Sequence, residues 1–133
     1  MNDEAFLAAL EDGSLPPAAF DHAAHVRAAY LYLRRLGFLP GMAAFRAALR
    51  AFAERHGVLD KYNETVTMAF LVLIHERMAA EAAFDWPVFA AAHPDLFDRK
   101  LLHRYYRPST LQSERAKRIF ILGELAERHH DVC

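Results

Sequence analysis

The stretch NETVTMAFLVLIHERMAA, residues 63–80, decides the fold. Every residue from Met68 to Ile74 is apolar, so a helix over this stretch is apolar around nearly its whole circumference. Such a helix belongs in the middle of a bundle, where other helices cover it. The same residues would suit a buried strand, but no partner strand is visible elsewhere in the sequence. We therefore predict a central helix from about Asn63 to Ala80.

Amphipathic helices are predicted on both sides of this central helix, and the fold class is all-α. Alanine is abundant, and apolar residues recur at steps of three and four, most clearly over residues 42–56. The second helix begins at a capping residue, either Ser14 or Asp21, and the sequence leaves this choice open. Besides the central helix, we expect helices at about 3–11, 14–36, 42–56, 94–105 and 113–129, and a short one capped by Asp85.

Length and composition fit a single helical domain. The chain has 133 residues, of which 54 % are hydrophobic and 25 % charged, as is typical of one globular domain. We expect residues 1–133 to form one bundle of about six to seven helices. The single cysteine, Cys133, leaves no internal disulfide framework and no cysteine-based zinc site.

The charge and the apolar runs exclude several partners. Sixteen Lys and Arg balance seventeen Asp and Glu, so the chain lacks the positive charge typical of a nucleic-acid-binding domain. Residues 1–14 are acidic and amphipathic, unlike a secretory signal. The apolar run in the central helix is far shorter than the ~20 residues that cross a membrane. We expect a soluble, cytoplasmic protein that binds neither nucleic acid nor membrane.

Polar residues, three histidines among them, gather at one end of the predicted bundle. Short connections make the second, third and fourth helices antiparallel neighbours. The start of the second, the end of the third and the start of the fourth should then meet. These segments read FDHAAHV (20–26), ERHG (54–57) and KYNETVT (61–67). The side chains that they bring together are His22, His25, His56, Tyr62, Asn63, Glu64 and Thr67.

One interpretation of this cluster is a metal site. His22 and His25 are three residues apart on one helical face, and Glu64 supplies a carboxylate. Imidazole nitrogens and a carboxylate are ligands that zinc and non-haem iron accept. His56 would be a fourth metal ligand or would form a hydrogen bond to one of the side chains that bind the metal. The cofactor in this interpretation is a divalent metal, either iron or zinc.

A metal-free interpretation uses the same residues. Here His25 or Glu64 is a general base, and the helix N-termini hold an anionic group of a small-molecule ligand. Tyr62, Asn63 and Thr67 would contact this ligand. Arg107, which follows two tyrosines, would cover the pocket from outside.

Each of these residues also has a structural explanation. His56 is predicted at a helix C-terminus, where the helix dipole favours a cation. Asn63 is a good N-cap, and Glu64 then lies in the first turn, where a negative charge is favoured. The expected convergence of these residues at one end is what favours a functional site over these separate explanations.

Three segments together resemble a family of small bacterial proteins of uncharacterised function. The family pattern is F-x-H-x-x-H-V-R, then Y-H-E-T-x-T, then L-x-S-x-x-A-R, and the similarity covers about residues 20–117. The resemblance implies an all-helical fold and singles out the same cluster, but it implies no reaction. Asn63 stands where the pattern has His, and Lys117 where it has Arg. The matching residues are His22, His25, Tyr62, Glu64, Thr67, Leu111, Ser113 and Ala116.

Two hypotheses of function follow from the sequence. The first is a small helical enzyme or ligand-binding protein with a His- and Glu-lined pocket at one end of the bundle. The second is a non-catalytic interaction module, for instance a homodimer, which would expose an apolar patch. Its patch would lie on the last helix, along Ile119, Phe120, Leu122 and Ala126.

Overall fold

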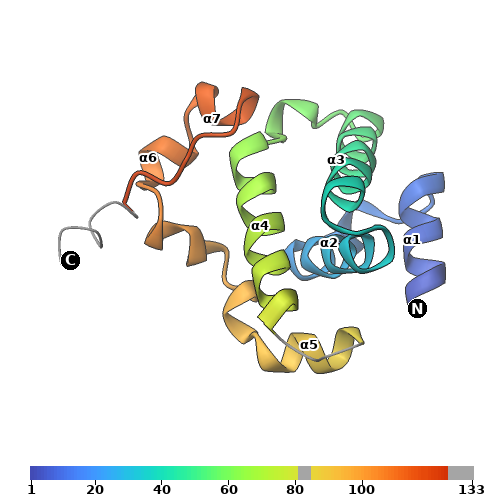
Figure 1. The fold of residues 1–133 in the computed structure, drawn as a ribbon. Coiled ribbons are helices and arrows are strands. Elements are labelled where there is room, and N and C mark those ends of the chain that lie inside the picture. The colour runs from blue at the N-terminus through green and yellow to red at the C-terminus, as the bar shows by residue number, and fades with distance from the viewer. Residues whose placement is uncertain (81–84, 126–133) are drawn as a thin grey trace.

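The computed structural model describes residues 1–80 and 85–125, and these residues form an all-α protein without strands. Figure 1 shows the course of the chain. The α-helices are α1 (Asp3–Asp12), α2 (His22–Leu36), α3 (Phe38–Arg55), α4 (Glu64–Ala80), α5 (Trp86–Ala92), α6 (Pro108–Leu111) and α7 (Glu114–Arg118). Short 3-10 helices occupy Pro17–Ala19 (η1), Leu59–Lys61 (η2), Pro94–Phe97 (η3) and Arg99–Arg104 (η4).

The stretch that decides the fold forms the central helix, as predicted. α4 lies between the α2–α3 pair on one side and the α6–α7 region on the other (Figure 1), and it contacts α2, α3, η4 and α7. Covered from both sides, Leu71 and Ile74 are completely buried. None of the described helices is long and apolar enough to cross a membrane.

Helices α2 and α3 pack closely because Gly41 of α3 lies where the two helices meet. Gly37 alone separates the two helices, and its φ of 87° is in the left-handed region that favours glycine. One turn later, a Cβ on Gly41 would lie only 2.6 Å from the carbonyl oxygen of Tyr32. The two backbones therefore approach more closely than any side chain at Gly41 would allow.

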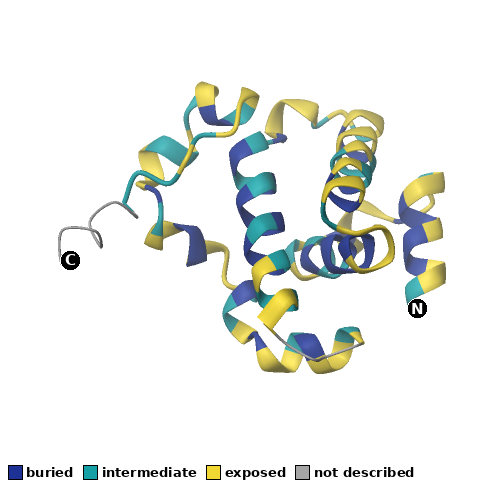
Figure 2. Cartoon of the chain, in the orientation of Figure 1, coloured by how far each residue is buried: buried dark blue, intermediate teal, exposed yellow. Residues whose placement is uncertain are grey.

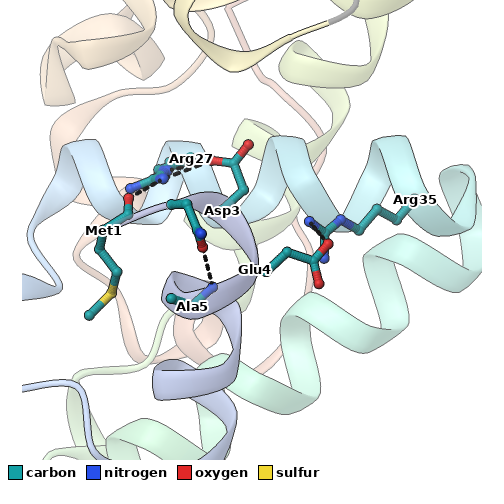
Figure 3. Close-up of polar contacts among 7 residues, drawn as sticks. Met1, Asp3, Glu4, Ala5, Arg27 and Arg35 are labelled. Carbon is teal, nitrogen blue, oxygen red and sulfur yellow. Dashed lines mark hydrogen bonds and ion pairs between the residues drawn. The ribbon is translucent and has the colours of Figure 1, made fainter.

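Helix α1 is held in the fold by apolar packing and by ion pairs to α2. Phe6, Leu7 and Leu10 are buried against the rest of the core, as the dark face of α1 in Figure 2 shows. Arg27 of α2 pairs with Asp3 at 2.7 Å, and Arg35 pairs with Glu4 at 3.1 Å (Figure 3). These pairs lie at or near the surface, so they contribute little compared with the buried side chains.

Two local predictions are settled or corrected before α6. The cap of α2 is Asp21, whose carboxylate accepts a hydrogen bond from Ala24 N, and Ser14 is not part of that helix. The prediction of one helix over about 94–105 is wrong. The chain is extended at Asp98, whose side chain caps a second short helix, so η3 and η4 replace the single helix.

The predicted last helix is also too long. α7 ends at Arg118, and residues 119–125 are not helical, while the rest of the predicted helix lies outside the described residues. Thr65 of α4 donates a hydrogen bond to Ile119 O and accepts one from Ile121 N. Tyr106 donates to Ile121 O. These bonds to the extended chain replace the hydrogen bonds that a longer helix would have made.

Candidate functional site

A cleft of about 530 Å³ opens at the end of the bundle where α2 begins and α3 ends. The side chains of His22, His25 and Thr67 line it, together with apolar residues. Its remaining lining residues are Pro17, Phe20, Leu49, Phe52, Ala53, His56, Val58, Lys61, Tyr62, Asn63, Val66, Phe70 and Arg99. Six of the seven residues of the cluster described above therefore share one wall, and only Glu64 does not.

A smaller apolar chamber of about 70 Å³ adjoins the cleft. His22, His25 and Thr67 line both spaces, so they lie at the junction between them. The other walls of the chamber are side chains of α2, α3 and α4, including Ala29 and Leu71. The chamber thus lies next to the cleft, with the histidine pair in the lining of both.

The two histidines of α2 are each held by a backbone carbonyl group. The ring nitrogen Nε2 of His22 lies 3.0 Å from Leu96 O, and Nδ1 of His25 lies 2.7 Å from Asp21 O. A carbonyl oxygen only accepts, so these ring nitrogens are the donors. The other nitrogen of each ring has no hydrogen-bond partner among the described residues. In the neutral ring, this second nitrogen carries a lone pair that can accept a proton or bind a metal.

Aromatic contacts fix both rings. His25 stacks on Phe20 at 4.0 Å between ring centroids, and His22 meets Phe70 edge-on at 5.0 Å. Burial lowers the pKa of both histidines below the ordinary value, and the charge of Arg99 lowers it further, against the opposing effect of the carbonyl hydrogen bonds. Both imidazoles are therefore neutral at neutral pH.

His56 lies on the same wall but has a different environment. It is the C-terminal cap of α3, and its ring contacts Phe52. Its Nε2 atom is buried and has no hydrogen-bond partner in the part of the chain that the structure describes. A buried nitrogen of this kind is unusual in a folded protein, and it lies beside the cleft rather than in the core.

Glu64 is directed to other partners. Arg46 of α3 binds its carboxylate through two nitrogens, with Nε at 3.1 Å from Oε1, and Tyr62 donates to the same oxygen at 2.6 Å. Burial alone would raise the pKa of Glu64, but the hydrogen bonds from Arg46 and Tyr62 outweigh it and lower that pKa. The carboxylate is thus an ionised group held between α3 and α4.

The histidine and carboxylate set predicted for a metal is therefore not assembled. Among the described residues, no three His, Cys, Asp or Glu side chains are placed to hold a metal ion together. His22 and His25 remain as a pair, without Glu64. The difference arises because Arg46, one helix away, offers Glu64 a charged partner that the sequence did not indicate.

Asn63 and Thr67 use their hydrogen-bonding groups within the fold. The Asn63 side chain accepts a bond from Val66 N, as an N-cap does, and donates one to Leu111 O at 2.7 Å. Thr67 donates its hydroxyl proton to Asn63 O. Where the resemblance expects a histidine, the amide of Asn63 thus serves as both a helix cap and a link to α6.

Arg107 is not in the cleft, although it was expected to cover the pocket. It is exposed at the start of α6, and its backbone N–H donates to Glu124. Two other cations line the cleft. One is Arg99, in the first turn of η4, and the other is Lys61. No pattern in the sequence connects Arg99 with the histidines, since only the fold brings η4 to the start of α2.

Comparisons of the chain with protein-family models, curated proteins and solved structures found no match. The resemblance noted from the sequence therefore stays a prediction.

Proposed function

We propose that this protein binds a small organic molecule in the cleft, with His22 and His25 as its main polar contacts. The observation that supports this most is the state of the two rings. Each imidazole is neutral, is fixed through one nitrogen by a carbonyl group, and keeps its second nitrogen unpaired among the described residues. A histidine needed only for folding would not require this arrangement twice on one wall.

The dimensions and composition of the cleft support the proposal. Small-molecule sites usually enclose about 300–1,000 Å³ and combine apolar walls with a few polar groups. The cleft has about 530 Å³, aromatic walls from Phe20, Phe52 and Phe70, and the histidine pair at its inner end. These are the features of a binding site for a molecule with an apolar body.

If the protein is an enzyme, His25 is the general base we propose. Its free Nε2 would take a proton from a ligand group, while Nδ1 keeps its own proton, whose hydrogen bond to Asp21 O holds the ring in place. Glu64, the other candidate base, is occupied by Arg46 and Tyr62. In this proposal Glu64 has a positioning role, because it connects the start of α4 with α3.

A fragment screen followed by NMR tests this function. Fragments should shift the backbone resonances around His22, His25 and Thr67. His25→Phe, which keeps a ring on Phe20 but removes the acceptor, should weaken these fragments about tenfold. The control is His103→Gln, at an exposed histidine outside the cleft. Unchanged affinity in His25→Phe, or shifts elsewhere on the surface only, would contradict the proposal.

A divalent metal bound by the pair is the second form of this proposal. Histidines that bind metals usually donate their other nitrogen to a carbonyl or carboxylate, as both histidines do here. His22 and His25 would hold zinc or iron, with the remaining positions left to water or the ligand. Metal analysis after reconstitution with zinc or ferrous iron tests it. Binding that His22→Ala does not reduce would exclude the pair as the metal site.

The interaction module remains a separate candidate function. The segment after α7 exposes apolar side chains: Leu122 is 78 % and Phe120 40 % accessible. A homodimer through this segment would cover them. Light scattering after size-exclusion chromatography would detect such a dimer, and Leu122→Glu should dissociate it. A monomer at all concentrations would exclude the homodimer.

A further inference from the structure

We propose that the ligand of the cleft is a small organic anion that carries a hydroxyl group on an apolar frame. This inference rests on the proposed function and adds the chemical class of the ligand. It follows from three properties of the wall: its charge, its apolar inner end, and the hydrogen-bonding groups that the fold leaves unused.

The charged side chains on the wall are cations. Among the described residues that line the cleft there are Lys61 and Arg99 but no Asp or Glu. Both cations are exposed, and neither forms an ion pair or hydrogen bond with a described residue. A cleft lined by one sign of charge attracts the opposite sign. An anionic group of the ligand would therefore sit between Lys61 and Arg99.

The inner end of the cleft suits an apolar group. The chamber of about 70 Å³ beyond the histidines is lined almost entirely by apolar side chains of α2, α3 and α4. A cavity of ~150 Å³ can hold a benzene ring. The smaller chamber would take a few carbon atoms, and the rings of Phe20 and Phe52 would cover the rest of the ligand frame.

The hydrogen-bonding groups that His22 and His25 leave unused are acceptors. The hydroxyl protons of Tyr62 and Thr67 are already donated within the fold, to Glu64 and Asn63 O. One amide proton of Asn63 is donated to Leu111 O. His22 and His25 have donated theirs to carbonyl groups. Each of these two imidazoles therefore offers the cleft only a lone pair, so the ligand group that meets His22 or His25 must donate. A hydroxyl group fits, because a buried ammonium group would need a carboxylate that this wall lacks.

Matched probes separate these requirements. The reference is para-hydroxyphenylacetate, which has the anion, the ring and the hydroxyl group. Phenylacetate and para-methoxyphenylacetate lack the donor, para-ethylphenol lacks the charge, and tyramine reverses it. An aliphatic pair, ω-hydroxyhexanoate and hexanoate, tests whether the frame must be aromatic. NMR titration of the full chain measures each affinity and shows which residues respond.

We expect the hydroxylated anions to bind about tenfold more tightly than each probe that lacks one group. Arg99→Gln and Lys61→Gln should remove the advantage of the carboxylate and leave para-ethylphenol unaffected. His25→Phe should remove the advantage of the hydroxyl group and leave phenylacetate unaffected. Because Lys61 and Arg99 are exposed, their variants should fold as the wild type does.

The outcomes distinguish this inference from the proposed function. If tyramine or para-ethylphenol binds beside His25 as tightly as the hydroxylated anions, the ligand class is wrong while the function of the cleft stands. The same holds if the hydroxyl group gives no advantage. If no probe of either charge shifts the resonances of the cleft at millimolar concentration, both proposals fail.

Discussion

At the scale of single residues, two backbone carbonyl groups decide which ring nitrogen carries the proton in His22 and in His25. Leu96 O accepts from Nε2 of His22, and Asp21 O accepts from Nδ1 of His25. His25 reaches its carbonyl because the start of α2 leaves Asp21 O one turn below. His22 reaches its partner only because η3 passes beside α2. The same HxxH spacing therefore gives two rings with opposite nitrogens free.

The lowered pKa values of these histidines predict that the protein loses stability in weak acid. Both groups bind a proton less readily in the folded state than in the unfolded chain, where the pKa is about 6.5. Their contribution is fully present above this value and is lost as the pH falls below it towards the lower folded pKa. Urea denaturation between about pH 8 and pH 5 should show this decline.

Variants assign the decline to the pair. His22→Phe and His25→Phe should each flatten the curve of unfolding free energy against pH below about 6.5. His103→Gln, at an exposed position, should keep the wild-type slope. If the slope is the same in all three variants, the burial of the pair does not cause it.

The hydrogen bonds of Thr65 predict how much stability is lost when one buried hydroxyl group is removed. Thr65 is fully buried, donates to Ile119 O and accepts from Ile121 N. Thr65→Val keeps the shape but leaves both backbone groups unpaired, which should cost about 1–3 kcal/mol. Thr67→Val is the matched control on the same helix: Asn63 O still accepts from Thr67 N, so the loss should be smaller. Equal losses by chemical denaturation would contradict this.

The residues of the site were predictable only where they share a short segment. The pair His22 and His25 and the segment 61–67 follow from helical spacing and short connections, and the cleft includes residues from both. Arg46 and Arg99 are charged partners from elements that no sequence pattern places next to these segments. For this reason the sequence put Glu64 with the histidines, whereas the fold pairs it with Arg46.

At the scale of elements, local signals predict a helix end when the cap is made by nearby residues. Asn2 and Asp21 cap α1 and α2 from their own first turns, and Gly13 ends α1 with a φ of 84°. The end of α7 is different, because Thr65 and Tyr106 fix the following chain from a distance. Helical propensity after Ser113 could not reveal these bonds.

Gly41 gives a test in which packing opposes helix propensity. Inside a helix, Gly→Ala usually stabilises by about 0.5–1 kcal/mol. Here a Cβ would lie 2.6 Å from Tyr32 O and 2.8 Å from Leu33 Cα, which are backbone atoms that cannot move alone. Gly41→Ala should therefore destabilise by about 1–3 kcal/mol. Thermal unfolding decides the sign, and a higher melting temperature would show that α2 and α3 can separate without cost.

At the scale of the whole molecule, the central helix α4 is packed differently on its two sides. On the side of α7, α4 is held by two hydrogen bonds between Thr65 and an extended chain, one donated and one accepted by its hydroxyl group. On the side of α2 and α3 the packing is apolar but incomplete, and the chamber and the cleft lie there. A bundle selected for stability alone would fill this space, because unfilled volume in a core lowers stability.

Filling the chamber therefore predicts opposite effects on stability and on binding. Ala29 of α2 lines the chamber and is 2 % exposed, so Ala29→Val would place two methyl groups in the empty space. Their burial should stabilise by about 1 kcal/mol, after the small helix penalty of valine.

Ala28, the next residue, is fully buried but does not line the chamber. Ala28→Val should overpack the core and destabilise by about 1–3 kcal/mol. Denaturant midpoints measure both variants, and the NMR titration with para-hydroxyphenylacetate measures binding. We expect Ala29→Val to be the more stable protein and the weaker binder, because the ligand frame loses its inner space. A stabilised Ala29→Val that binds as tightly as the wild type would show that the ligand stays outside the chamber. The histidines would then contact it only from the cleft side.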